Sequence, residues 1–309
     1  MSRRTPQQKP LPPLATKHGV GPSCVTLPQG AWPTIAAFLR QRFPAISAEI
    51  WSERMAAGEV VDQAGERVTE ERPYRPHQRI FYYRSLTAEP TLPVEERVIF
   101  QDECIVVADK PHFLPVIPSG HYVQETLLAR LKRKLNIDTL VPVHRLDRET
   151  AGVVVFCVQS NMRGAYQDLF RLRRVTKQYE AIVHRPEELE ARDIYRSRLE
   201  EDLHFMRMRE VDGAPNTETH LRMLDASGSF AHFRLSPITG RKHQLRVHCA
   251  ALRMPIVNDH FYPELQPACA DNYERPLQLL ATSIAFQDPI TGQAREFVTT
   301  RQLQGTQPT

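Results

Sequence analysis

The stretch Val141–Val158, VPVHRLDRETAGVVVFCV, joins a charged loop to an apolar segment. Val153–Val158 is an uninterrupted apolar run rich in β-branched residues, and its length predicts a buried β-strand. The preceding Thr150–Gly152 predicts a tight bend. Asp147 therefore lies, with the arginines beside it, on a loop that a buried strand holds in place. Such an aspartate is expected to stay ionised at neutral pH, because nearby positive charge favours the anion.

Two interpretations of Asp147 remain open on this stretch alone. An ionised aspartate with fixed surroundings is suited to act as a nucleophile. The alternative is an Arg–Asp pair that ties the loop down and performs no chemistry.

The segment His144–Gly152, HRLDRETAG, resembles the signature of the RluA family of RNA pseudouridine synthases, in which the aspartate is catalytic. The family usually has Ser where this chain has Ala151. Sister families tend to have Gly in place of the histidine, so His144 favours the RluA branch. The resemblance covers roughly residues 92–300, and its motifs occur in the family's order.

The composition sets broad limits. The chain has 309 residues and a formal net charge of +4, which allows one large domain or two modest ones and permits nucleic acid as a partner. Basic residues cluster at 130–134 and 163–177. The five cysteines are scattered without a CxxC motif, which argues against a disulfide scaffold or a zinc site. No stretch resembles a signal peptide or a membrane span. We expect a cytoplasmic monomer with reduced thiols and no metal.

The N-terminal quarter predicts a tail and a small domain. Residues 1–25 are rich in proline and basic residues and predict a flexible tail; RNA contact through the tail is the weaker alternative. A helix is expected from Trp32 with Pro33 in its first turn, and another over 47–57 with Ser47 as N-cap. Short strands joined by Gly turns follow. This order is similar to the S4 RNA-binding module that often precedes the family's catalytic domain; RNA binding and a purely structural or oligomer-contact role both stay open. The basic residues of the tail are Arg3, Arg4, Lys9 and Lys17.

Two further segments before the Asp147 loop carry basic residues. Val98–Pro111 predicts two strands around a polar turn and resembles the start of the family's catalytic domain. Lys110 at its end is either a phosphate contact or a solvated strand end. Residues 124–136 predict an amphipathic helix with a basic outer face.

Lys177–Val183 alternates like a strand and resembles the family's second motif, Lys-x-Tyr. The ring of Tyr179 is then expected to stack on a base, and its hydroxyl to take part in proton movement. Without the resemblance, Tyr179 is an ordinary half-buried strand residue. Residues 161–174 predict a helix whose arginines at the C-terminal end are favoured by the helix dipole.

Ser236–Ala250, SPITGRKHQLRVHCA, resembles the family's third motif, with Lys242 in place of the usual Thr. Thr239 is expected to cap a helix that begins near residue 241. By the resemblance, Arg246 pairs with the catalytic aspartate; the alternative is an arginine that caps a loop carbonyl. His243 and His248 are five residues apart, which does not fit a metal pair on one helix face.

The resemblance implies an α+β fold. We expect a catalytic domain over 91–301 with a mixed, largely antiparallel sheet and a central basic cleft, preceded by an S4-like domain over 26–90. Residues 1–25 and 302–309 are expected to be tails.

The resemblance also implies the chemistry. Asp147, Tyr179 and Arg246 would be catalytic, after the target uridine is flipped into the site. Attack at C1′, attack at C6 and a glycal route all remain open. The partner would be rRNA or tRNA, with no cofactor, metal or membrane. The residues expected to contact RNA are His144, Arg145, Lys110, Lys177, Arg241, Lys242 and His243.

Two other functions compete with this interpretation. A non-catalytic RNA-binding or ribosome-assembly protein could keep the same scaffold, and it would not need Asp147. A glycoside hydrolase would need a second carboxylate, and Glu149 and Asp259 are the nearest candidates.

Overall fold

The computed structural model describes residues 13–84, 89–185, 193–204, 206–267 and 269–304, which form two compact units. The first comprises residues 1–89, 120–124 and 129–138, and the second comprises 90–119, 125–128 and 139–309, as far as each is described. Within these residues no helix has the length and apolar character required to cross a membrane. Arg3, Arg4 and Lys9, expected in the tail, lie outside the described residues.

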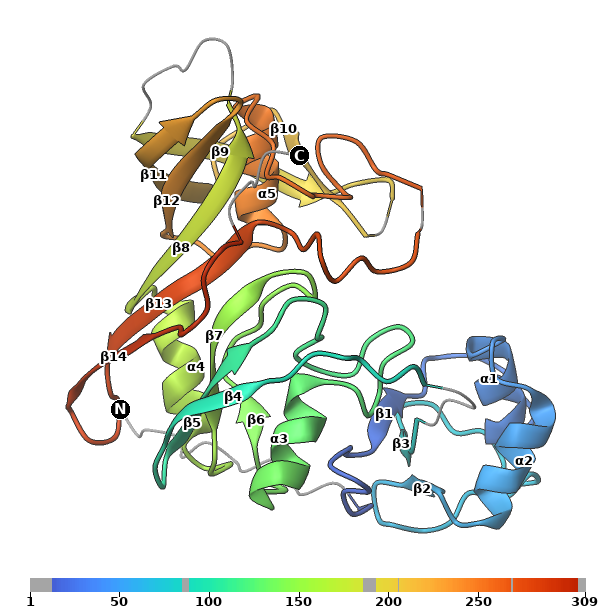
Figure 1. Ribbon diagram of the computed structural model, residues 1–309. Helices are drawn as coiled ribbons and strands as arrows, with labels where there is room; N and C mark the ends of the chain where they lie inside the picture. The colour runs from blue at the N-terminus through green and yellow to red at the C-terminus, as the bar shows by residue number, and fades with distance from the viewer. Residues whose placement is uncertain (1–12, 85–88, 186–192, 205, 268, 305–309) are drawn as a thin grey trace. The chain divides into compact units, whose positions relative to one another are not determined.

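The first unit contains a small antiparallel sheet of order β1-β3-β2 and two helices (Figure 1). Trp51 of α2 is fully buried and meets the Tyr82 ring edge-on, at 5.3 Å between centroids. Aromatic and aliphatic side chains from both helices and all three strands fill this core. The elements are β1 (Ser23–Thr26), α1 (Ile35–Arg42), α2 (Ala48–Ala56), β2 (Val60–Asp62) and β3 (Arg79–Tyr82).

Three details of this unit differ from or refine the expectations. Thr34 is the N-cap of α1, so Pro33 precedes the helix and is not in its first turn. Ser47 caps α2 as predicted, accepting a hydrogen bond from the Ile50 amide. Residues 23–25, expected in the tail, belong to β1, and Lys17 pairs with Glu59 at 2.5 Å. The likeness to an S4 module stays a prediction.

The second unit is built on an eleven-stranded sheet. Its order is β10-β9-β11-β12-β8-β13-β7-β5-β4, with β14 paired to β13 and β6 paired to β7. Among the described pairs only β13–β7 is parallel, so the sheet is mixed and largely antiparallel, as predicted. The strands are β4 (Arg97–Gln101), β5 (Ile105–Lys110), β6 (Val141–Pro142), β7 (Ala151–Cys157), β8 (Val175–His184), β9 (Ile194–Glu201), β10 (Met208–Val211), β11 (Thr217–Ser227), β12 (Phe230–Pro237), β13 (Leu279–Gln287) and β14 (Ala294–Val298).

Strand β13 links the two halves of this sheet (Figure 1). On one side, α4 (Arg163–Arg171) packs Tyr166 and Leu169 onto residues of β7 and β13. On the other side, α5 (Gln244–Ala251) packs Leu245 and Cys249 onto residues of β8, β11 and β12. The remaining helix, α3 (Leu127–Leu135), has residues in both units.

Gly152 lies within β7, at the point where β7 pairs with β13, and not in a bend before the strand as the sequence suggested. Its φ is +117°, in the region that favours glycine. A Cβ at this position would lie 2.1 Å from the carbonyl oxygen of Ala281. A glycine is therefore required for the two strands to approach each other directly after the Asp147 loop.

We expect Gly152→Ala to lower the free energy of unfolding by about 2–4 kcal/mol, because the substitution adds backbone strain and a clash with the neighbouring strand. Chemical denaturation of both proteins measures the change. Gly164→Ala in α4 is the matched control, since a Cβ there meets no atom within 4 Å and alanine favours a helix. Equal stability of the Gly152 variant and the wild type would contradict the argument.

Candidate active site

Asp147 lies on the loop between β6 and β7, and two nitrogen atoms approach one of its oxygens. Its Oδ2 is 3.7 Å from Nη1 of Arg246 and 3.8 Å from Nε2 of His243. About a quarter of the side chain is exposed, at 27%. The loop turn is closed by a hydrogen bond from the Thr150 amide to the Asp147 carbonyl, at 3.2 Å. The carboxylate is thus held on a short loop with one edge toward the Arg246 guanidinium and the His243 ring.

Arg246 projects from α5 and is almost fully buried, with its side chain 1% exposed. The predicted partner, Asp147, is not its closest one. Nε and Nη2 bind the two carboxylate oxygens of Asp259 at 2.8 and 2.6 Å, and Nη1 lies 3.4 Å from Glu149. Burial lowers the pKa of Arg246, but the hydrogen bonds and charge of Asp259 outweigh burial, so the pKa is raised. Arg246 is therefore a fixed cation that turns one nitrogen toward the Asp147 loop.

Tyr179 lies on β8 and is half-buried, between Leu235 of β12 and Ala281 of β13 in the strand register. It lines a cavity of about 100 Å³ together with Asp147 and Arg246. Burial, and then the charge of Asp147, raise the pKa of Tyr179. The phenol therefore stays neutral at ordinary pH, so it is suited to stack and to donate a hydrogen bond.

The loop before α5 is organised differently from the prediction. The helix begins at Gln244 with His243 as N-cap, and Thr239 does not cap it. The buried Gln244 side chain holds the loop instead, accepting from the Thr239 hydroxyl at 2.7 Å and from the Arg241 amide at 3.2 Å. Sequence reasoning missed this role of Gln244. A glutamine directly after basic residues at a helix start gives no specific signal of it.

Lys110 cannot contact phosphate, which corrects its predicted role. The side chain is fully buried. Its Nζ donates to the carbonyl oxygens of Pro111, Leu114 and Arg148 at 2.8–2.9 Å. Lys110 therefore ties β5 to the residue that follows Asp147.

The buried amine should make stability depend on pH. Burial lowers the pKa of Lys110 to about 7, against the opposing charges of Glu149 and Asp147. Between this value and the ordinary pKa of 10.5 the unfolded chain binds more protons, so stability rises with pH in that window. We expect the wild type to gain about 1–2 kcal/mol over Lys110→Met between pH 7 and pH 9. Denaturation at both pH values tests this, with exposed Lys242→Met as the control; an unchanged difference would contradict it.

His144 is also not the cationic RNA contact that was expected. Burial lowers its pKa to about 3, with a smaller effect from Lys177. Its Nε2 accepts a hydrogen bond from the Val155 amide at 3.1 Å, and its ring stacks on Phe170 at 4.7 Å. His144 therefore anchors the Asp147 loop to β7 and α4 as a neutral ring.

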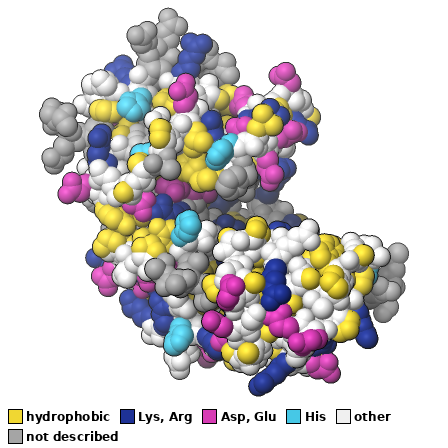
Figure 2. Space-filling model, turned by 90° about the vertical axis from the view of Figure 1, so that its right-hand side faces the viewer, with side chains coloured by type: hydrophobic (Ala, Val, Ile, Leu, Met, Phe, Trp, Pro, Cys, Tyr) yellow, Lys and Arg dark blue, Asp and Glu magenta, His cyan; other side chains and the backbone are white. Residues whose placement is uncertain are grey.

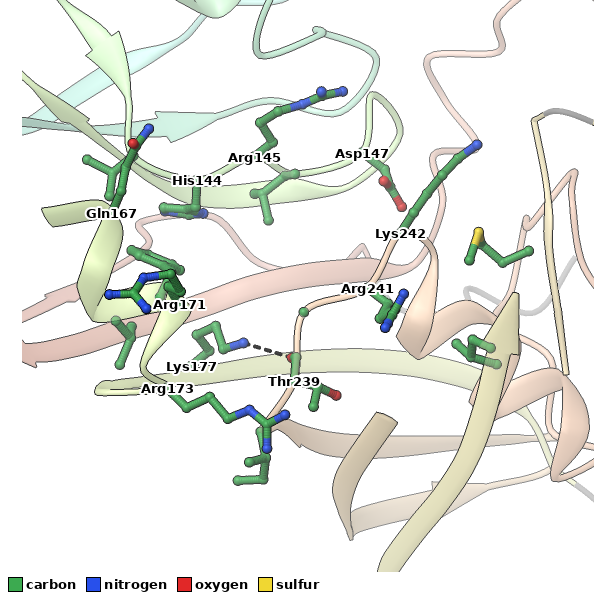
Figure 3. A pocket seen from close by; sticks show the side chains of 18 of the residues that line it. His144, Arg145, Asp147, Gln167, Arg171, Arg173, Lys177, Thr239, Arg241 and Lys242 are labelled. Carbon is green, nitrogen blue, oxygen red and sulfur yellow. Dashed lines mark hydrogen bonds between the residues drawn. The ribbon is translucent and has the colours of Figure 1, made fainter. Parts of the chain in front are cut away.

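The other predicted basic residues do meet in one place. Arg145, Arg241 and Lys242 are exposed and line an open cleft of about 1350 Å³, and the cleft includes Asp147 and Tyr179 (Figure 3). Lys177 also lines it and donates to the Thr239 carbonyl at 2.9 Å. Burial, and then the charge of Arg173, lower the pKa of Lys177 to about 8.

Four further arginines of this cleft were not predicted as site residues. Three come from α4 and the turn after it, where the cluster was seen in the sequence but attributed to the helix dipole; the fourth is on β9. Basic side chains are otherwise mixed with acidic ones on the face drawn in Figure 2. Eight basic and three acidic side chains line the cleft. These arginines are Arg163, Arg171, Arg173 and Arg198.

Among the described residues, no group of three His, Cys, Asp or Glu side chains is placed to hold a metal ion. Asp147, Arg246 and Tyr179 line the small cavity, and the cations around them line the cleft beside it.

Comparisons with known proteins agree with this geometry. Residues 104–251, which contain Asp147, Tyr179 and Arg246, match the family model for RNA pseudouridylate synthase. The RNA pseudouridine synthase slr1592 of Synechocystis is 29% identical over 228 residues, covering 73% of this chain and 78% of that protein. The dual-specificity RNA pseudouridine synthase RluA of Haemophilus influenzae is 29% identical over 215 residues, covering 65% of this chain and 90% of that protein.

A longer relative and a solved structure complete the comparison. The mitochondrial pseudouridylate synthase RPUSD4 of Homo sapiens is 34% identical over 194 residues, or 54% of this chain, and the chain spans only about half of that relative, 51% of its length. The structure of human RNA pseudouridylate synthase domain containing 4 superposes with a TM-score of 0.51 at 28% identity, covering 66% of this chain and 87% of that one. The chain therefore belongs to the RluA family of RNA pseudouridine synthases, which are isomerases.

Proposed function

We propose that this protein isomerises specific uridines in structured RNA, either rRNA or tRNA or both, with Asp147 acting on the ribose of a flipped nucleotide. One observation carries the proposal. Asp147 from a loop, Tyr179 from β8 and Arg246 from α5 line one small cavity, and this cavity shares residues with the basic cleft. No two of these residues are close in sequence, so the fold alone brings them together.

The reaction requires one bond to break and another to form within the same nucleotide. The bond from C1′ to N1 breaks, uracil rotates, and C5 bonds to C1′ while C5 loses its proton and N1 gains one. The Asp147 carboxylate would stabilise the electron-poor ribose or bond to it; attack at C1′, attack at C6 and a glycal route all fit this site. Uracil both leaves and returns, so no second carboxylate is needed to activate water.

Arg246 and Tyr179 would support Asp147 from two sides. The guanidinium, fixed by Asp259, would orient the Asp147 carboxylate. The neutral phenol of Tyr179 would stack on the uracil. Proton loss from C5 would need another acceptor while the phenol stays protonated.

The basic cleft would hold the RNA during base flipping. Flipping costs a few kcal/mol, least for an unpaired uridine, and phosphate contacts from lysine and arginine supply binding energy that does not depend on sequence. The exposed Arg145 would fill the space left by the base or bind a phosphate. Arg241, Lys242 and the arginines of α4 lie in the same cleft as further phosphate contacts.

The structure weakens one competing function. A glycoside hydrolase would need a second available carboxylate, but Asp259 is 1% exposed and bound by Arg246. Glu149 also faces Arg246, at 3.4 Å. A non-catalytic RNA-binding protein on this scaffold remains the alternative, and it would not depend on the carboxylate of Asp147.

We also infer that the first unit acts as an S4-like RNA-binding domain and that the protein works in the cytoplasm. The support for the domain is its pair of helices beside a small antiparallel sheet. The support for the compartment is five free cysteines among the described residues. Deletion of residues 1–89 should weaken RNA binding if the domain contacts RNA.

The decisive experiment is modification mapping. Unmodified rRNA and tRNA transcripts are incubated with the purified protein, and pseudouridines are located by chemical labelling that stops reverse transcription. We expect stops at one or a few uridines, which would name the substrate. Binding of these RNAs without any new pseudouridine would favour the non-catalytic alternative and overturn the proposal.

A further inference from the structure

His243 occupies an unusual position at the start of α5. Its φ is +54°, in the left-handed region that costs free energy for a residue with a side chain. The side chain is 8% exposed. The ring lies edge-on to Phe261 and Tyr262, at 5.5 and 5.7 Å between centroids. The strained backbone and the two aromatic neighbours fix where the imidazole points.

The two ring nitrogens face different groups. Nδ1 lies 3.0 Å from the hydroxyl oxygen of Tyr262, and Nε2 lies 3.8 Å from Oδ2 of Asp147. The Tyr262 hydroxyl is itself fixed, because it accepts a hydrogen bond from the Met208 amide at 2.7 Å and lies 3.2 Å from the Met208 carbonyl. The imidazole is therefore clamped between β10 and the Asp147 loop.

The charge of Asp147 decides between the two neutral tautomers of His243. Tyr262 has one hydroxyl hydrogen, which can go to Nδ1 of His243 or to the Met208 carbonyl. A bare Nε2 lone pair facing the Asp147 carboxylate would be repelled, whereas an N–H there is attracted. A neutral His243 therefore carries its hydrogen on Nε2 and accepts from Tyr262 at Nδ1.

The contacts of Asp147 with Arg246 and with His243 are made by the same carboxylate oxygen. Nη1 of Arg246 and Nε2 of His243 each approach Oδ2, at 3.7 and 3.8 Å. Two donors on Oδ2 would fix the carboxylate plane and turn Oδ1 toward the ribose. At these distances the contacts are looser than hydrogen bonds, and catalytic contacts commonly tighten when substrate binds.

We propose that His243 is a positioning residue, whose Nε2–H closes onto Oδ2 of Asp147 when RNA binds and so directs Oδ1 to the ribose. The inference deepens the proposed function and rests on it. It also replaces the RNA-contact role that the sequence suggested for His243. The Tyr262 hydroxyl is part of the assignment, because it can donate its hydrogen to Nδ1 and so is compatible with a hydrogen on Nε2.

The surroundings of His243 make its titration a readout of this contact. Burial lowers the pKa of His243, and the negative charge of Asp147 partly opposes burial. Arg246 and Lys242 lower the pKa further, and Glu149 raises it. Removing the charge of Asp147 should therefore lower the pKa of His243 more.

Two amide substitutions separate the contacts of the two nitrogens. Gln reaches the position of Nε2 and can donate to Asp147, whereas Asn reaches only the position of Nδ1 and Tyr262. On an RNA that the wild type modifies, we expect single-turnover rates to fall less than tenfold in His243→Gln and about 30- to 100-fold in His243→Asn. RNA affinity should stay within twofold in both. Equal rates for the two variants, or a loss confined to RNA affinity, would overturn the proposal.

A measurement without RNA keeps this test separate from the proposed activity. Long-range nitrogen NMR of labelled histidines in the full-length protein reports the tautomer and titration of His243. We expect an Nε2–H signal and a midpoint below 6.5 that falls further in Asp147→Asn. An Nδ1–H tautomer, or a midpoint unaffected by Asp147→Asn, overturns the positioning role even if pseudouridine is formed. Absence of pseudouridine with these NMR results intact would count against the activity alone.

Discussion

Asp147→Asn is expected to lower the rate of pseudouridine formation by a factor on the order of 10⁴ or more, the scale seen when a nucleophile is removed. Asparagine has nearly the same shape, so it should preserve the loop. It carries no negative charge for the ribose and cannot form an ester. Affinity for RNA should change by no more than about twofold, because the cations that line the cleft are untouched. Single-turnover kinetics and a binding titration with the same RNA measure the two effects.

Glu149→Gln is the matched control for this substitution. It makes the same chemical change two residues away, on the same loop, at a carboxylate that also faces Arg246. We expect its rate to stay within tenfold of the wild type. If Asp147→Asn kept a few per cent of the activity, or if both variants lost activity equally, Asp147 would not have the role proposed for it.

Arg246→Met is expected to cost about 3–5 kcal/mol in the free energy of unfolding, in addition to the activity. The methionine would fill much of the space but leave Asp259 buried and unpaired. That carboxylate now receives two hydrogen bonds from Arg246 and two from the amides of Phe261 and Tyr262. Denaturant titration gives the change in stability.

The paired substitution Arg246→Met with Asp259→Asn separates charge from packing. With the uncompensated carboxylate removed, we expect the double variant to recover part of the stability that the single variant loses. It should not recover activity, because Asp147 would still lack its fixed cation. Additive losses in the two single variants would mean that the residues do not act as a pair.

The residues of the site were readable from the sequence, but their closest partners were not. The resemblance to the RluA family brought forward Asp147, Tyr179 and Arg246, and the structure places all three around one cavity. The hydrogen bonds between Arg246 and Asp259 depend on how the loop after α5 folds back. That path could not be predicted from the thirteen positions that separate the two residues in the sequence. Local pattern predicts which face a residue occupies, not which distant side chain meets it.

The sequence pattern also could not decide whether a residue at the end of a strand is buried or exposed. Lys110 follows a short apolar run, which is equally consistent with a solvated end and with the buried position that the structure shows. Ile194–Glu201 forms β9, although half of its residues are charged. The more buried positions of that strand, Tyr195, Ser197 and Leu199, alternate with more exposed ones, but Ser197 is polar, so the sequence shows no apolar alternation of period two.

The position of β13 has a consequence for biosynthesis. This strand separates β8, which carries Tyr179, from β7, which follows Asp147, and it begins at residue 279, which is 279 − 147 = 132 positions beyond that aspartate. At ordinary ribosomal speeds roughly 7–26 s pass between the emergence of the two segments. Until β13 has emerged from the ribosome, the strand that carries Tyr179 and the strand that follows Asp147 cannot be joined in one sheet. Acquisition of activity should therefore be a late and abrupt event in the making of each molecule.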